Sequence, residues 1–268
     1  MSYRSLLLSL VLVGCGDNII LETPVDGALN DSTPDSPPDA DPDSLTPPNN
    51  CTDSVTAIKP GNPGADPSAY PADGWWSDDT RTNGMVAIDD TIEPPLTLGC
   101  TAARFVTGAT TASPSQDKAQ LISYKLAGTA LSTITNIKYW AYRSSASTGG
   151  PAVDLALNVF ITGTSVPGNY ASLTYEPYQQ AAGQNAIVED TWQQWNATST
   201  TLGEGNWWTS KIANPAPGSQ SLPIPWATFQ AMYADAKVVG YGFNVGSFNP
   251  NMVLAGDGLE FGTTTTDF

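Results

Sequence analysis

The sequence predicts an all-β protein, a sandwich or a barrel, with one short helix near residues 225–236. Glycine (24) and proline (22) are frequent among the 268 residues, and charged residues make up only 13%, against about 25% in an average protein. Apolar residues occupy every second position from Val153 to Ile161, which is the period of a strand with one face in a core. Many short segments of this kind with polar turns between them favour two packed sheets or a closed one.

Ten strands are expected along the chain, separated by clusters of Gly, Pro, Ser and Thr. They are Met85–Ile88, Ala103–Thr107, Ala119–Leu126, Ile134–Arg143, Val153–Thr162, Tyr170–Tyr175, Thr191–Asn196, Trp207–Ser210, Val238–Val245 and Met252–Phe261. The fifth and sixth are joined by a turn-rich loop and form a long hairpin. For the helix, Pro225 suits the first helical position, and Trp226, Phe229 and Tyr233 then fall on one stripe.

The N-terminal region predicts export. Arg4 supplies a short basic end, and Leu6–Val13 is an apolar run too short to span a bilayer. The segment Leu12-Val13-Gly14-Cys15 resembles the lipobox of bacterial lipoproteins. The resemblance implies that residues 1–15 are a signal peptide, that Cys15 is lipidated, and that the lipid anchors the protein to the inner or outer membrane of the cell envelope, with the domain facing the periplasm or the exterior.

Residues 16–50 are expected to form a disordered tether. They contain eight acidic residues, seven prolines and no basic residue, and such a stretch has little apolar surface to bury. The folded part is then one domain, residues 51–268, which holds 18 acidic and nine basic residues and a charge of −9. Of the three cysteines, lipidation leaves Cys51 and Cys100 in an oxidising compartment, which predicts one disulfide between them; two buried thiols are the alternative.

Composition excludes several functions. The whole chain carries 26 acidic and 10 basic residues and a net charge of −16, which argues against nucleic-acid binding because a basic face is needed there. The chain has no histidine, which removes the Ser-His-Asp triad, the Cys-His dyad and the HExxH zinc helix. Paired carboxylates remain the only acid–base machinery, but the Glu-x-Asp-x-x-Glu strand motif of concanavalin-like retaining glycosidases is missing. No catalytic residue is predicted.

Several short motifs, in their order along residues 74–268, resemble a broad group of secreted bacterial β-sandwich domains. They are Asp117–Leu121, Tyr142–Ser145, Tyr175–Tyr178, Thr191–Ala197, Trp207–Trp208, Asn244–Ser247, Asp257–Leu259 and Thr266–Phe268. The resemblance implies an antiparallel β-sandwich of the jelly-roll type, like concanavalin or carbohydrate modules, and assigns no catalytic residue. Asn196 stands where such domains often place Asp, which weakens a metal-binding role at this position.

Aromatic residues are the main candidates for ligand binding, because flat rings stack on sugars while amides and carboxylates bond the hydroxyls. In a strand, the two members of Trp75-Trp76 or Trp207-Trp208 point to opposite faces, so at most one of each pair belongs to the core. The binding candidates are Trp140, Tyr142, Arg143, Glu176, Tyr178, Trp195 and Trp208, and the first five are considered for one exposed sheet face. A cross-strand ion pair between Arg143 and Glu176 and an ordinary aromatic core are the structural alternatives.

A structural calcium ion is the one cofactor considered. Two acidic doublets flank the first expected strand, and another acidic residue lies near the last one, so a carboxylate-rich loop could form where the two strands meet. The candidates are Asp78, Asp79, Asp89, Asp90 and Asp257; solvated turn residues are the alternative. The sequence as a whole predicts a surface-tethered lipoprotein that binds a glycan or another cell-surface polymer. A structural or adhesive protein that binds another protein, and a carboxylate-based glycosidase or lyase, are the alternatives, and the oligomeric state is not predicted.

Overall fold

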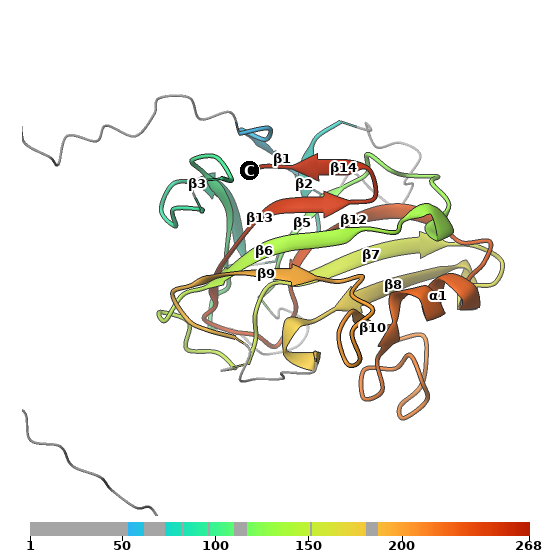
Figure 1. The fold of residues 1–268 in the computed structure, drawn as a ribbon. Helices are drawn as coiled ribbons and strands as arrows, with labels where there is room; N and C mark the ends of the chain where they lie inside the picture. Colours follow the sequence, from blue (N-terminus) through green and yellow to red (C-terminus); the bar gives the residue numbers. More distant parts are fainter. Residues whose placement is uncertain are drawn as a thin grey trace, which may run out of the picture. The chain divides into compact units, whose positions relative to one another are not determined.

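The computed structural model describes residues 53–61, 73–81, 83–95, 97–109, 117–150, 152–180 and 187–268, all within one compact unit, Pro48–Phe268. The predicted signal peptide, the tether and Cys51 lie outside these residues. The described chain forms two sheets with one short helix (Figure 1), which confirms the predicted all-β sandwich. Among the described helices, none is long and apolar enough to cross a membrane.

The larger sheet has eight strands. In spatial order they are β1 (Ile58–Pro60), β2 (Trp75–Ser77), β5 (Ala119–Ser123), β12 (Lys237–Val245), β7 (Ala156–Thr162), β8 (Tyr170–Tyr175), β10 (Asn206–Trp208) and β11 (Ile224–Pro225). The smaller sheet has the order β3 (Met85–Asp89), β4 (Ala102–Val106), β13 (Val253–Phe261), β6 (Ile137–Arg143) and β9 (Trp192–Asn196), and β14 (Thr264–Thr266) pairs with β13. Neighbouring strands are antiparallel except β1 and β2, which are parallel.

The path of the chain between the sheets is that of a jelly roll. Counting from β4, the chain visits the smaller sheet in β4, β6, β9 and β13 and the larger one in β5, β7, β8 and β12. The central orders β4-β13-β6-β9 and β5-β12-β7-β8 are those of two interlocked Greek keys. The topology thus confirms the predicted jelly-roll class.

The core lies between the sheets and is filled by the inward residue of each alternating pair. Phe243 of β12 packs against Phe105 of β4 at 5.9 Å and against Tyr139 of β6 at 5.4 Å between ring centroids, and Tyr241 stacks on Phe261 at 4.0 Å. The alternation read from Val153–Thr162 holds, since Leu157, Val159 and Ile161 are fully buried. Rings of this size contribute most of the buried apolar area in such a core.

The ten expected strands are all present, with ends shifted by up to three residues. The strand expected from Ile134 starts at Ile137 because Leu131–Thr133 forms a 3-10 turn (η2). The expected helix is α1 (Trp226–Met232), with Pro225 one residue before it; Trp226, Phe229 and Tyr233 are buried on one side, as predicted. Four strands of two or three residues, β1, β2, β11 and β14, were not expected, because segments so short carry no readable period.

Candidate functional site

The five residues considered for one exposed face do not lie on one sheet. Trp140, Tyr142 and Arg143 belong to β6 in the smaller sheet, whereas Glu176 and Trp208 lie at the end of β8 and on β10 in the larger sheet. The expectation of a common face is therefore wrong. The chain changes sheets between β6 and β7, and a period-two pattern carries no information about which sheet a strand joins.

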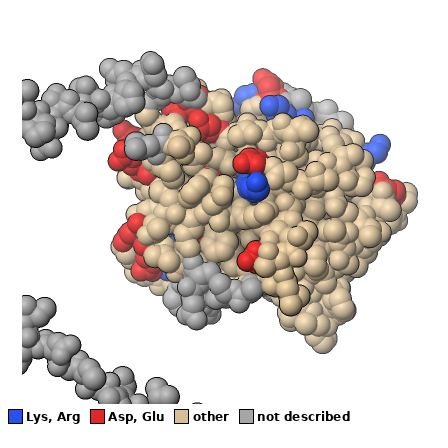
Figure 2. All heavy atoms as spheres, viewed as in Figure 1, with Lys and Arg blue, Asp and Glu red and all other residues tan. Residues whose placement is uncertain are grey.

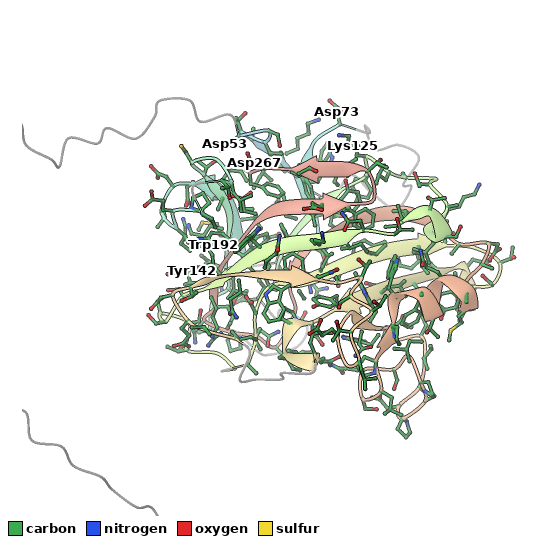
Figure 3. The ribbon with its side chains drawn as sticks, in the orientation of Figure 1. Asp53, Asp73, Lys125, Tyr142, Trp192 and Asp267 are labelled. Carbon is green, nitrogen blue, oxygen red and sulfur yellow. The ribbon has the colours of Figure 1, made fainter. Side chains whose placement is uncertain are left out.

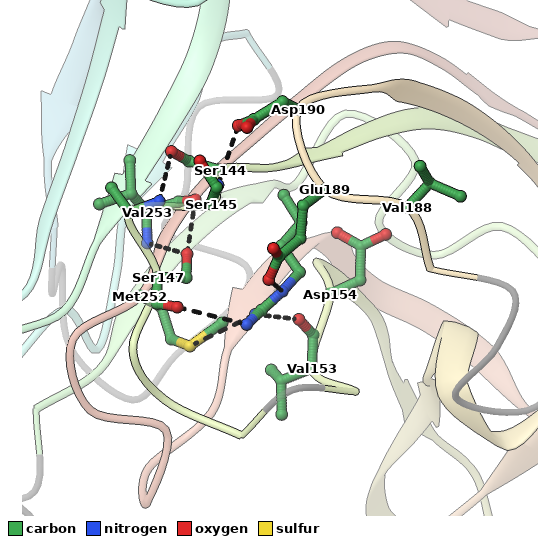
Figure 4. Close-up of polar contacts among 12 residues, drawn as sticks. Ser144, Ser145, Ser147, Val153, Asp154, Val188, Glu189, Asp190, Met252 and Val253 are labelled. Atoms are coloured by element: carbon green, nitrogen blue, oxygen red, sulfur yellow. Dashed lines mark hydrogen bonds and ion pairs between the residues drawn. The ribbon is translucent and has the colours of Figure 1, made fainter.

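Two of the seven predicted binding residues, Arg143 and Trp195, point inward. Arg143 is 2% exposed, and its Nε donates to Glu189 Oε1 at 3.2 Å while Nη1 donates to the Val153 carbonyl at 2.8 Å (Figure 4). Trp195 donates from Nε1 to Asp154 Oδ2 at 3.2 Å, and burial raises the pKa of Asp154 to about 6. Arg143 thus pairs with Glu189 rather than with Glu176, and this buried group joins the end of β6 to two loops.

The outward face of the smaller sheet carries Trp140 and Tyr142. Tyr142 lies beside Trp192 with 5.6 Å between ring centroids (Figure 3), and its hydroxyl donates to Asp190 at 3.1 Å. Trp192 Nε1 donates to the Glu93 carbonyl at 2.7 Å. Figure 2 shows this side of the molecule as mostly uncharged, with acidic side chains gathered towards β3. The polar atoms of this aromatic pair are engaged by the protein itself.

The five predicted metal ligands do not come together. Asp79 binds Arg81 and Lys118 at 2.8 and 2.6 Å, and Asp89 binds Arg104 at 2.8 Å. Asp257 is buried and accepts from the backbone N–H groups of Gly258 and Phe268. No group of three or more Cys, Asp or Glu side chains that could hold a metal ion occurs in the part of the chain that the structure describes.

A different set of residues is brought together on the outward face of the eight-stranded sheet, called the outer face below. One row of direct partners crosses six neighbouring strands and consists of Trp76, Ile122, Gly242, Asn158, Thr174 and Trp208. A tryptophan stands at each end. With about 4.8 Å between strands, the two tryptophans lie roughly 24 Å apart along the sheet. A second row lies two residues further along each strand, and in it Gln120 of β5 is the direct partner of Asn244 of β12.

The polar residues of the outer face are unusually buried for an outward position. Gln120, Asn158 and Asn244 are 3%, 6% and 8% exposed. Among the described residues, their side-chain carbonyl oxygens have no hydrogen-bond partner, and neither has Trp76 Nε1. A buried polar group without a partner costs about 1–3 kcal/mol, so four of them on one face call for a reason outside the stability of the fold.

The central strand β12 carries two glycines at outward positions, where neighbouring residues leave no room for a side chain. Gly240 and Gly242 are direct partners of Phe160 and Asn158. A side chain at Gly240 would press on Tyr124 and Ile122, and one at Gly242 would collide with the Leu121 carbonyl oxygen. Glycine in a strand interior weakens the strand and often marks a place where a ligand approaches the backbone.

Glu176 lies at the Trp208 end of the outer face. Its Oε2 accepts from Tyr178 Oη at 2.9 Å and from Trp208 Nε1 at 2.8 Å. Burial raises the pKa of Glu176, although hydrogen bonds from Tyr178, Trp208 and Gln220 act in the opposite direction. Leu173 and Tyr175 face the core as predicted, but Glu176 is half-buried rather than exposed, because its neighbours close over it.

Three of the predicted residues, Glu176, Tyr178 and Trp208, therefore belong to the outer face. The other residues of this face, Trp76, Gln120, Asn158 and Asn244, were not among those predicted from the sequence. A signal for the amides was present, because each stands at an outward position in an otherwise apolar strand. The three amides lie in adjacent rows only because of the order of the strands in the sheet, and this order could not be predicted from the sequence. The tryptophan pairs behave as parity predicts, with Trp75 and Trp207 buried and Trp76 and Trp208 half-buried.

No protein-family profile matches this chain, and no curated protein matches it. A solved structure of an arabinose-bound α-L-arabinofuranosidase is similar, with a TM-score of 0.34 and 13% sequence identity over 68% of this chain. The match spans 22% of the enzyme's chain. A likeness of this size does not carry the enzyme's activity over to this protein.

Proposed function

We propose that this protein binds a glycan or a similar hydroxyl-rich polymer on the outer face of its eight-stranded sheet, without chemical change to the ligand. The observation that supports the proposal most strongly is the group of three buried amides in two adjacent rows, Gln120, Asn158 and Asn244, whose side-chain oxygens have no partner in the described chain. The oxygens are buried, so a ligand would reach them only after the side chains above them move, and its hydroxyl groups would then donate to them.

The aromatic residues at the two ends of the row suit the same ligand. Trp76 and Trp208 lie at outward positions on β2 and β10 and are half-buried. Lys59 Nζ lies over the Trp76 ring, 5.1 Å from its centroid, so Trp208 offers the freer flat apolar surface. Such a surface next to polar groups fits a sugar ring with its apolar face and its rim of hydroxyls.

Binding to a glycan array, followed by titration of the best glycan, tests this proposal. Trp208→Ala is expected to weaken binding by about 1–3 kcal/mol, as expected for an aromatic anchor. Trp140→Ala is the matched control, because Trp140 is also half-buried but lies on the smaller sheet. If the array shows no binding, or if both substitutions weaken glycan binding equally, the outer face is not a glycan site. An adhesive or structural role is then favoured.

We also propose that the protein is exported and anchored by a lipid on Cys15. The support is the Leu12–Cys15 segment and the acidic, proline-rich stretch that follows it. An anchored tether of about 35 residues would span roughly 35 Å as a flexible chain. It would present the sandwich to polymers near the cell surface.

A bond between Cys51 and Cys100 belongs to this proposal. The support lies two residues after Cys51, where Asp53 Oδ1 accepts from the backbone N–H of Cys100 at 2.9 Å and Oδ2 accepts from Thr101 Oγ1 at 3.0 Å. The chain next to Cys51 is thus held beside Cys100. An oxidising compartment would favour the bond.

A further inference from the structure

A cleft of about 570 Å³ lies between the loop that joins β9 to β10 and the start of α1 (Figure 1). It is called the helix cleft below. Leu202 and Glu204 line it from the loop, and Pro225, Ala227 and Gln230 line it from α1 and the residue before α1. None of them belongs to the row of direct partners on the outer face. A cleft of this size holds a small organic molecule.

The walls of the helix cleft are mostly apolar. Leu202 stands at its rim and is 95% exposed, and Pro225 and Ala227 are exposed as well. The helix α1 contains no charged residue. Concave apolar surface is what binds the body of a small ligand, whereas a few polar groups fix its orientation.

Among the described residues that line the helix cleft, Glu204 is the only ionisable one. Its Oε2 accepts from Ser199 Oγ at 2.8 Å, and no Lys or Arg of the described chain forms an ion pair with it. Burial raises the pKa of Tyr175, and the negative charge of Glu204 adds to this rise, so the charge acts on the interior of the fold as well. Because a hydroxyl donor leaves the charge in place, the helix cleft favours a cation.

Gln230 supplies a second acceptor. Its Nε2 donates to the carbonyl oxygens of Leu131 at 2.8 Å and Ile134 at 3.0 Å, which fixes the orientation of the amide. Its Oε1 accepts no hydrogen bond from the described chain, and it is not enclosed as the amide oxygens of the outer face are. A carboxylate and an amide oxygen only accept. A ligand in the helix cleft therefore has to donate.

We infer that the helix cleft binds a small organic cation, with the apolar body of the ligand against Leu202 and Ala227 and its ammonium group beside Glu204. An ammonium group has three donors and no acceptor, so it matches both the acceptors and the unpaired charge. A carboxylate in its place would set acceptor against acceptor and bring a second negative charge. The inference is independent of the proposed glycan binding, because the helix cleft and the row on the outer face share no residue.

Three ligands that share one body and differ in charge test the inference. The full chain is titrated with 3-phenylpropylamine, 3-phenylpropanol and 3-phenylpropanoate, and binding is followed by ligand-detected NMR. The amine is expected to bind about two- to fivefold more tightly than the alcohol, which is the gain from one exposed ion pair. The carboxylate should bind more weakly than the alcohol. Added salt should reduce the preference for the amine, because salt screens an exposed pair.

Two substitutions locate the site. Glu204→Gln keeps an acceptor for Ser199 Oγ and removes the charge, so the affinity for the amine should fall to that for the alcohol, which should not change. Leu202→Ser removes the apolar rim and should weaken the amine and the alcohol alike. Both replaced side chains are exposed, so thermal unfolding should show folded variants. Glu93→Gln is the control, since Glu93 is also exposed but lies outside the helix cleft.

Four results would overturn the inference. None of the three ligands binds at millimolar concentration, or the amine and the alcohol bind equally well. The third is that Glu93→Gln lowers the affinity for the amine as much as Glu204→Gln does, which would mean that the amine responds only to the net charge of the protein. The fourth is that Trp208→Ala abolishes amine binding, which would place the amine on the outer face.

Discussion

Gln120 on β5 and Asn244 on β12 are direct partners across neighbouring strands, and each carries a buried amide oxygen without a hydrogen-bond partner in the described chain. This arrangement predicts opposite effects on stability and on binding. Asn244→Val suits a strand and removes the unpaired group, so the free energy of unfolding should stay the same or rise by about 1 kcal/mol. Glycan binding should fall by about 1–3 kcal/mol, because a donor on the ligand loses its acceptor. Thermal unfolding and titration of the same sample measure both.

Asn136→Ala serves as the control for this pair of effects. Asn136 donates from Nδ2 to Glu260 Oε2 at 2.7 Å, away from the outer face. The Asn136→Ala substitution should therefore leave glycan binding unchanged. A loss of stability in Asn244→Val with normal binding would mean that Asn244 is part of the fold and not of the site.

The buried Arg143 predicts a large effect on stability. Arg143→Met removes the donors to Glu189 and to the Val153 carbonyl and should cost about 1–3 kcal/mol, because the carbonyl loses its hydrogen bond inside the protein. Glu189→Gln keeps an acceptor on a side chain that is 48% exposed, so it should cost about 1 kcal/mol or less. Urea unfolding of both variants checks the order. Equal losses would show that the energy lies in the ion pair rather than in the bonds from Arg143 to the backbone.

Asp257 predicts a dependence of stability on pH. Burial, with smaller contributions from Asp267 and Asp53, raises the pKa of Asp257 to about 8. Because the folded-state pKa lies above the unfolded value, the stabilisation is fully present below about pH 4 and is lost as the pH rises through about 8. Asp257→Asn keeps an acceptor for the N–H groups of Gly258 and Phe268 and cannot ionise.

The variant should therefore be more stable than the parent at pH 9, by a few kcal/mol at most, and the difference should shrink towards pH 4. Melting temperatures of the two proteins across this range give the comparison. Asp90→Asn is the control, because Asp90 is exposed. A constant difference at every pH would contradict a role for ionisation.

The cysteine pair predicts a cross-linked peptide. Mass spectrometry without reduction should find Cys51 joined to Cys100, and Cys100→Ala should lower stability by roughly 2–4 kcal/mol through the closed loop. Asp53→Ala is informative beside it, because it removes the bonds to Cys100 and Thr101 without touching a thiol. Two thiols that react with an alkylating agent in the native protein would refute the bond.

Lipidation predicts a label on Cys15. Cells fed a clickable fatty acid should incorporate it into the wild-type protein, and Cys15→Ser should remain unlabelled and unprocessed. Cys100→Ala controls for attachment at another cysteine. If the wild-type protein stays unlabelled in cells that label other lipoproteins, Cys15 is not lipidated.

The sequence alone determined the class of the fold and the content of most strands. The alternation from Val153 to Ile161 and the stripe of Trp226, Phe229 and Tyr233 are local periods, and local periods follow from which face of one strand or helix must be buried. The same reasoning correctly placed one member of each tryptophan pair in the core. It also placed Trp140 and Arg143 on opposite faces of β6.

Only the tertiary structure decided which outward faces meet. Trp140 and Glu176 fall on different sheets, while Trp76 and Trp208 share a row although 132 positions separate them. Arg143 likewise forms its ion pair with Glu189 and not with Glu176. The physical reason is that strand order depends on pairings between segments far apart in the chain. Such pairings are chosen by the packing of the whole core, which no single strand encodes.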